Sequence, residues 1–118
     1  MNIEKGQIIT ARTYAEFLNK TFGTNYIGYG RSTYNYSNDI VVWMIRIDGK
    51  ERKGFKNYMD GSNIVEESFT EPTRSKKPIR MVFRVIDIDK NTKNFVYLGK
   101  FKLSKDSTKT KRIFAPVE

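Results

Sequence analysis

Residues 79–103 read IRMVFRVIDIDKNTKNFVYLGKFKL, and this stretch indicates the fold more clearly than any other. In its first half, apolar side chains occupy every second position, as on one face of a strand: Ile79, Met81, Phe83 and Val85. The alternation changes parity at Ile86 and Ile88, which indicates a β-bulge or the end of one-sided burial. The second half places further apolar side chains on one face: Phe95, Tyr97, Phe101 and Leu103. Residues 89–94 are typical of a turn, so the stretch predicts a long antiparallel hairpin.

Further strands are predicted on both sides of this hairpin. Residues 39–48 (DIVVWMIRID) are an apolar run closed by Asp48 and Gly49, which is typical of a strand buried on both faces. Trp43 is therefore expected in the core, together with Phe83 and Val85. Shorter strands are predicted at 7–10, 64–69 and 112–117, with Pro116 tolerated only at an edge or an end. Loops are predicted at 50–62, which is polar and rich in glycine, and at 71–78, which is basic and bounded by prolines.

One helix is predicted near residues 13–22. Thr13 and Glu16 form a capping box at its start, and Gly23 is a natural stop after its end. Between them the larger apolar side chains fall on one helical stripe: Tyr14, Phe17, Leu18 and Phe22. Because no later segment sustains the helical period, we expect this helix to be the longest in the chain.

Together these elements predict a β-rich domain of the α+β class. We expect about five or six short strands and one early helix, arranged as a small curled antiparallel sheet or a barrel. A barrel would remove the exposed strand edges that such apolar strands otherwise present. At 118 residues the chain has the size of one domain, so residues 1–118 are expected to form a single unit.

The charge of the chain is its strongest functional signal. Lys and Arg number 22 against 13 Asp and Glu, which leaves a formal net charge of +9. A domain this basic favours a polyanionic partner such as nucleic acid, although a basic surface can also serve solubility alone. Without an apolar run of about 18 residues or a secretory leader at the start, we expect a cytoplasmic protein and no membrane partner.

Several classes of chemistry are excluded by composition. The chain has no cysteine and no histidine, which removes disulfides, thiolate metal sites and every Ser-His arrangement. The remaining candidates for acid–base chemistry are the carboxylates of Asp60, Glu66, Glu67, Asp87 and Asp89. None of them lies in a nuclease motif, and the chain has no glycine-rich phosphate loop. We therefore expect no enzymatic activity, no metal and no cofactor.

Residues 23–39 contain four of the seven tyrosines of the chain, outside any predicted helix or strand. An irregular connection rich in aromatic residues is often functional. Tyrosine faces can stack on a base, while a cation holds the flanking phosphate. Candidate nucleic-acid-binding residues in this stretch are Tyr29, Arg31, Ser32, Tyr34 and Tyr36. The alternative is that these rings only seal one end of the barrel.

A second candidate surface lies in residues 49–59, where cations alternate with an aromatic side chain. The segment contains Lys50 and the candidate binding residues Arg52, Lys53, Lys56 and Tyr58. Two weaker basic segments follow, one with Lys76 and Lys77 and one at residues 105–112. Charge runs of this kind are also found on surfaces that only contact solvent.

In order along the chain, several short motifs resemble one family of DNA-reading domains. They are GQIIT at 6–10, Phe22, GYGRS at 28–32, MVFRVIDI followed by FVYLG at 95–99, and RIF at 112–114. This order is similar to that of the SRA-like, PUA-like β-barrels of modification-dependent restriction endonucleases. The resemblance implies a barrel that reads a modified or extruded base. The chain departs from it at residues 55–69, which are shorter than in those relatives, and it resembles no nuclease or helicase segment.

Three hypotheses for the function remain open, two of them nucleic-acid binding and one protein binding. The leading hypothesis is a nucleic-acid-binding module, with DNA preferred over RNA, that reads a modified or flipped base through the aromatic and basic loop. The alternative is a small inhibitor or adaptor of a phage or mobile element that binds a host defence protein, since tyrosine and arginine are also enriched at protein interfaces. An RNA-binding PUA-like domain is the third possibility.

Overall fold

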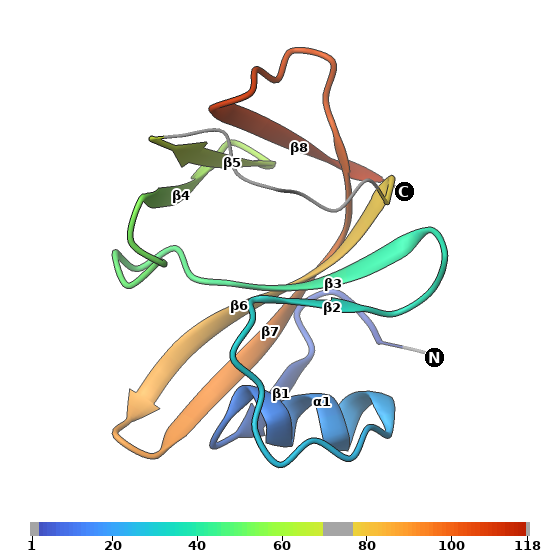
Figure 1. Cartoon of the computed structure of the whole chain (residues 1–118), viewed down its shortest axis with the longest axis vertical. Helices are drawn as coiled ribbons and strands as arrows, with labels where there is room; N and C mark the ends of the chain where they lie inside the picture. Colours follow the sequence, from blue (N-terminus) through green and yellow to red (C-terminus); the bar gives the residue numbers. More distant parts are fainter. Residues whose placement is uncertain (1–2, 70–76, 118) are drawn as a thin grey trace.

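The computed structural model describes residues 3–69 and 77–117, which form one eight-stranded sheet and one helix (Figure 1). The elements are β1 (Ile8–Ala11), α1 (Tyr14–Phe22), β2 (Thr33–Asn35), β3 (Ile40–Ile45), β4 (Phe55–Asp60), β5 (Asn63–Ser68), β6 (Ile79–Asp89), β7 (Thr92–Leu103) and β8 (Lys111–Val117). The strand order is β2-β3-β6-β7-β8-β5-β4, and β1 pairs with β7. The predicted fold class, β-rich with a curled sheet and one early helix, is confirmed.

The predicted hairpin forms the bent centre of the sheet, and a β-bulge divides it into two halves. Val82 pairs with Gly99 but Phe83 pairs with Tyr97, so Leu98 is an extra residue in β7. Gly99 has a φ of 108°, which favours glycine at this position. The bulge reverses which side of β7 its later side chains occupy. The prediction that one face carries all the apolar residues of β7 is therefore wrong beyond Leu98.

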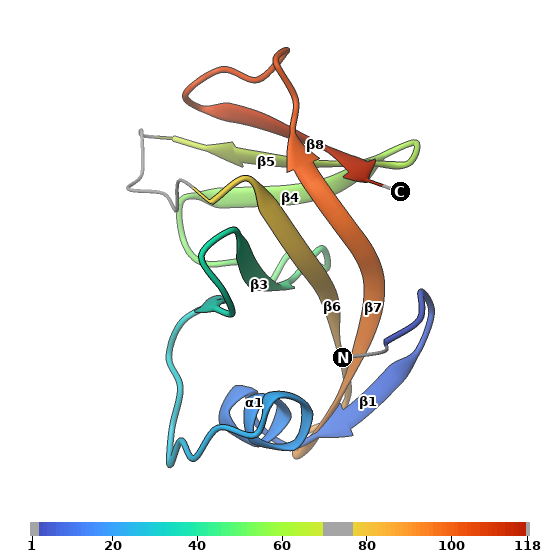
Figure 2. The same ribbon diagram turned by 90° about the vertical axis from the view of Figure 1, so that its right-hand side faces the viewer.

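Two hydrophobic clusters cover the two faces of the central strands. The cluster beneath α1 includes Phe17, Leu18, Met44, Phe83, Val85, Phe95 and Tyr97. The other lies where β4, β5 and β8 curl over the sheet, and includes Trp43, Ile45, Ile64, Val82, Phe101 and Phe114 (Figure 2). This arrangement explains why residues 41–45 are all buried, as the continuous apolar run predicted. The predicted burial of Trp43, Phe83 and Val85 is confirmed.

The helix begins and ends where the sequence predicted. The Glu16 backbone N–H donates to Thr13 Oγ1 over 3.0 Å, and Gly23 closes the helix with a φ of 71°. Phe17 stacks on Phe95 with 4.1 Å between ring centroids, which fixes α1 against the hairpin. No helix within residues 3–69 and 77–117 is long and apolar enough to span a membrane.

Replacing Thr13 by alanine is expected to lower the free energy of unfolding by about 1 kcal/mol, because it removes the side-chain acceptor at the helix start. Urea denaturation followed by far-UV circular dichroism measures this change. Thr13→Ser keeps the acceptor and is the matched control, expected to remain near the parent. Equal stability of both variants would show that the cap contributes nothing.

Two strands were not predicted, and one pairing differs from an all-antiparallel sheet. β2 lies in the tyrosine-rich stretch, and β4 lies in the segment 50–62 that was predicted to be a loop. β4 tolerates polar residues because it pairs only with β5 among the described strands. β3 and β6 are paired in parallel. The β4–β5 hairpin lies between them in the sequence and at the far edge of the sheet, and a connection of this length allows two paired strands to run in the same direction.

Candidate nucleic-acid interface

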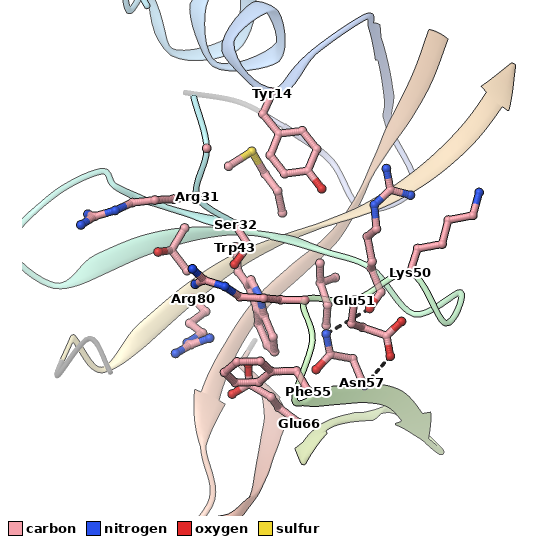
Figure 3. A pocket seen from close by; sticks show the side chains of 16 residues that line it. Tyr14, Arg31, Ser32, Trp43, Lys50, Glu51, Phe55, Asn57, Glu66 and Arg80 are labelled. Atoms are coloured by element: carbon pink, nitrogen blue, oxygen red, sulfur yellow. Dashed lines mark hydrogen bonds between the residues drawn. The ribbon is translucent and has the colours of Figure 1, made fainter. Parts of the chain in front are cut away.

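A pocket of about 330 Å³ opens beside β3 and β4 (Figure 3). The start of α1, residues 30–33, the connection 46–54 and one residue each from β5 and β6 also line it. Its volume falls in the range of about 300 to 1,000 Å³ that is usual for small-ligand sites. Three kinds of side chain line it: the aromatic Tyr14, Trp43 and Phe55; the cationic Arg31, Arg46, Lys50, Arg52 and Arg80; and the acceptor-bearing Glu51, Asn57 and Glu66.

The three aromatic side chains of the pocket differ in how available their faces are. The Arg80 guanidinium lies 4.5 Å from the Trp43 ring centroid and 4.6 Å from that of Phe114, so it covers a face of the buried indole. Tyr14 and Phe55 are only half-buried and lie on opposite sides of the pocket in Figure 3. They are the rings best placed to contact a flat ligand between them.

Asn57 holds the connection 46–54 against β4, and two acceptors at this contact have no donor among the described residues. Its side-chain Nδ2 donates to the Arg46 carbonyl over 3.0 Å, and its backbone N–H donates to Glu51 Oε2 over 3.0 Å. The Arg46 contact fixes the orientation of the amide. Asn57 Oδ1 and Glu51 Oε1 are buried, and neither has a hydrogen-bond partner among the described residues. A buried acceptor without a donor costs about 1 to 3 kcal/mol, a cost that a ligand N–H would remove.

An ion-pair network lies at the end of β3 beside the pocket. Arg46 donates to both carboxylate oxygens of Asp87 over 3.0 and 3.1 Å, and also to Asp48 over 3.1 Å. Lys50 Nζ donates to Asp87 over 3.0 Å, and Lys93 Nζ lies 3.6 Å from the same carboxylate. Hydrogen bonds from Arg46 and then Lys50 hold the pKa of Asp87 well below its usual range. Burial raises the pKa of the neighbouring Tyr14 hydroxyl above its ordinary value.

The structure brings some of the predicted site residues into this pocket. Arg31, Ser32 and Arg52 line it. Tyr29 and Tyr34 are half-buried and pack against the cluster beneath α1. Their ring centroids lie 6.4 Å apart, and the Tyr29 hydroxyl donates to the Thr33 carbonyl. These two rings therefore pack on the core, as in the alternative in which they only seal one end of the barrel.

The remaining predicted residues lie outside the pocket wall. Tyr36 is 40% exposed, with its ring 5.5 Å from that of Phe22. Lys56 and Tyr58 lie on β4, where Lys56 Nζ sits 5.7 Å from the Tyr58 ring centroid. Lys53 precedes this strand and is exposed. Lys77 donates to the Ser37 carbonyl, and Lys76 lies outside the described residues.

Sequence reasoning missed most of the pocket wall. Phe55 and Asn57 are two residues apart on one strand, a spacing that places both on one face, but β4 was not recognised. Arg80 was not predicted as a site residue, because it alternates with the apolar residues of the hairpin; it is 7% exposed, since β5 and β8 curl over its side of the sheet. Tyr14 was assigned to the helix stripe, and as the first residue of α1 it both packs against the cluster beneath the helix and lines the pocket.

Comparison with solved structures shows a likeness in fold. No protein-family description and no curated protein matches the chain. The solved structure of the 5-hydroxymethylcytosine-specific restriction enzyme AbaSI is similar to 93% of this chain, with a TM-score of 0.70 and 23% sequence identity. The chain spans 38% of the length of that AbaSI chain. At this identity the likeness shows a related fold, as the resemblance to restriction-enzyme barrels implied.

Proposed function

We propose that this chain is a DNA-binding module that receives one nucleotide, turned out of the duplex, in the pocket beside β3 and β4. One observation carries the proposal: two residues that each hold a buried acceptor without a donor line a pocket that has half-buried rings on opposite sides and a cationic rim. Stacking faces, edge acceptors and phosphate-binding cations are what recognition of an extruded base requires.

The charge and the fold support DNA as the ligand. A net charge of +9 attracts phosphates at long range, and the pocket itself carries more cations than carboxylates. The fold is related to that of an enzyme named for 5-hydroxymethylcytosine, a DNA base. We assign no reaction to this chain, and the protein-binding and RNA-binding alternatives become outcomes of the binding test.

The acceptors suggest which base edge the pocket selects. Asn57 Oδ1 and Glu51 Oε1 can each accept an N–H, and the amide of Asn57 is held in one orientation. The exocyclic amino group of cytosine, adenine or guanine presents two N–H donors on the edge that an extruded base exposes, whereas thymine presents only its N3–H there. We therefore propose an amino-bearing base, whose modification the rest of the pocket would accommodate.

A binding titration tests the proposal. Plain, methylated, hydroxymethylated and phosphorothioated duplexes are compared, with single strands and RNA as competitors. We expect a duplex to bind most tightly and log K to fall linearly with log salt. Affinity weaker than millimolar at low salt, or binding that salt does not affect, would favour a protein partner instead. Tighter binding of RNA would favour the RNA-binding alternative.

Arg31→Ala is expected to weaken binding to all duplexes together and to lower the salt slope by about one, because Arg31 is exposed at the pocket rim and free to contact a phosphate. The slope is measured from titrations at several salt concentrations. Lys90→Ala, in the exposed turn between β6 and β7, is the charge-matched control and should leave the slope unchanged. Equal slopes for both variants would remove Arg31 from the interface.

A further inference from the structure

The cations around Asp87 are not equivalent. Side-chain exposure is 15% for Arg46 and 21% for Lys93, but 63% for Lys50. Arg46 contacts both carboxylate oxygens, whereas Lys50 makes one contact through a flexible stem. Lys50 also lines the pocket, while Asp87 does not. Arg46 lines the pocket as well, so what distinguishes Lys50 is that it is the most exposed and least constrained of the Asp87 partners at the candidate ligand site.

Loss of Lys50 would leave Asp87 well satisfied. The carboxylate would keep the two-point contact with Arg46 and the nearby Lys93 ammonium, so no buried charge would be left unpaired. An exposed ion pair changes an equilibrium constant by no more than about fivefold, so exchanging one anionic partner of Lys50 for another costs little free energy. A phosphate at the pocket rim offers Lys50 an equally good anionic partner.

We propose that Asp87 is an internal competitor of phosphate for Lys50. On binding, Lys50 moves from the Asp87 carboxylate to a backbone phosphate next to the pocket, while Arg46 and Lys93 stay on Asp87. This inference rests on the proposed DNA-binding function. It assigns to Asp87 a role in setting affinity, which differs from that of a residue that only holds the end of β3 in place.

A double-mutant cycle with Asp87→Asn and Lys50→Gln tests the competition. With a duplex ligand at low salt, Asp87→Asn should bind about two- to fivefold more tightly than the parent, because Lys50 no longer has to leave an ion pair. Lys50→Gln should bind more weakly, with a salt slope lower by about one. In the double variant the gain from Asp87→Asn should vanish. Asp89→Asn removes the same charge two residues away and controls for the overall field.

The outcomes separate three explanations. A gain in Asp87→Asn that persists in the Lys50→Gln background, or an equal gain in Asp89→Asn, would mean a general charge effect and would overturn the competition. Weaker binding by a folded Asp87→Asn would mean that Asp87 only positions Arg46, which also overturns it. A parent that binds no duplex overturns the proposed function itself. Should Asp87→Asn fail to fold, NMR of the parent decides: the Lys50 ammonium resonance should shift on duplex addition while that of Lys93 does not, and an unchanged Lys50 resonance would contradict the proposal.

Discussion

Replacing Phe83 by alanine is expected to lower the free energy of unfolding by about 3 to 5 kcal/mol. The ring is fully buried on β6, with its centroid 4.9 Å from that of Phe17 and 4.9 Å from that of Tyr97. It therefore joins the helix to both strands of the hairpin. Truncation loses the transfer energy of the ring and leaves a cavity that these rigid neighbours cannot fill.

Chemical denaturation of Phe83→Ala and Ile86→Ala measures the effect against a matched control. Ile86 lies on the same strand but is 37% exposed, so its truncation should change the free energy of unfolding by only about 0.5 kcal/mol or slightly more. A loss of less than about 1 kcal/mol for Phe83→Ala would mean that α1 does not pack on the hairpin as described.

Phe55→Ala is expected to reduce the preference between the best and the poorest duplex by about 1 to 3 kcal/mol, the range for a base stacked on an aromatic ring. Phe55 is half-buried and lies in the pocket wall across from Tyr14. Its loss removes a stacking face but no phosphate-binding cation, so the salt slope should remain that of the parent.

Tyr58→Ala is the control for this experiment, because Tyr58 lies on the same strand, is also half-buried and does not line the pocket. It should retain the preference. Competition titrations with both folded variants measure the two quantities separately. If Phe55→Ala keeps the full preference while Tyr58→Ala loses it, the exposed side of β4 binds the ligand and the pocket does not.

Local patterns predicted those parts of the fold that depend on neighbours in the sequence. The helix was predicted because Thr13, Glu16 and Gly23 set its ends, and the hairpin because its apolar alternation spans a clear turn. The bulge at Gly99 was not predicted, because a glycine in a predicted strand does not by itself show that the side chains after it lie on the opposite face of the sheet.

The pocket could be predicted only in part because it is assembled from distant segments. Arg31, Ser32 and Arg52 were identified from charge and composition, which are local properties. Tyr14 and Asn57 belong to different elements, and both line the pocket because the curled sheet brings β4 to the end of β3, where Asn57 contacts Arg46. The tyrosine-rich loop was the most conspicuous segment, yet it packs two of its rings on the core and presents only residues 30–33 to the pocket.

Extrusion of a base into the pocket is tested most directly by varying the cost of extrusion. One duplex is prepared with the same target base paired, mismatched or in a single-nucleotide bulge, and its affinity for the parent and for Phe55→Ala is measured at one salt concentration. A protein that takes a base out of the stack binds more tightly when that base is already unpaired, by up to a few kcal/mol. We predict that affinity for the parent rises from paired to mismatched to bulged, and that Phe55→Ala loses most of this rise. Equal affinity of the parent for all three duplexes would contradict the account.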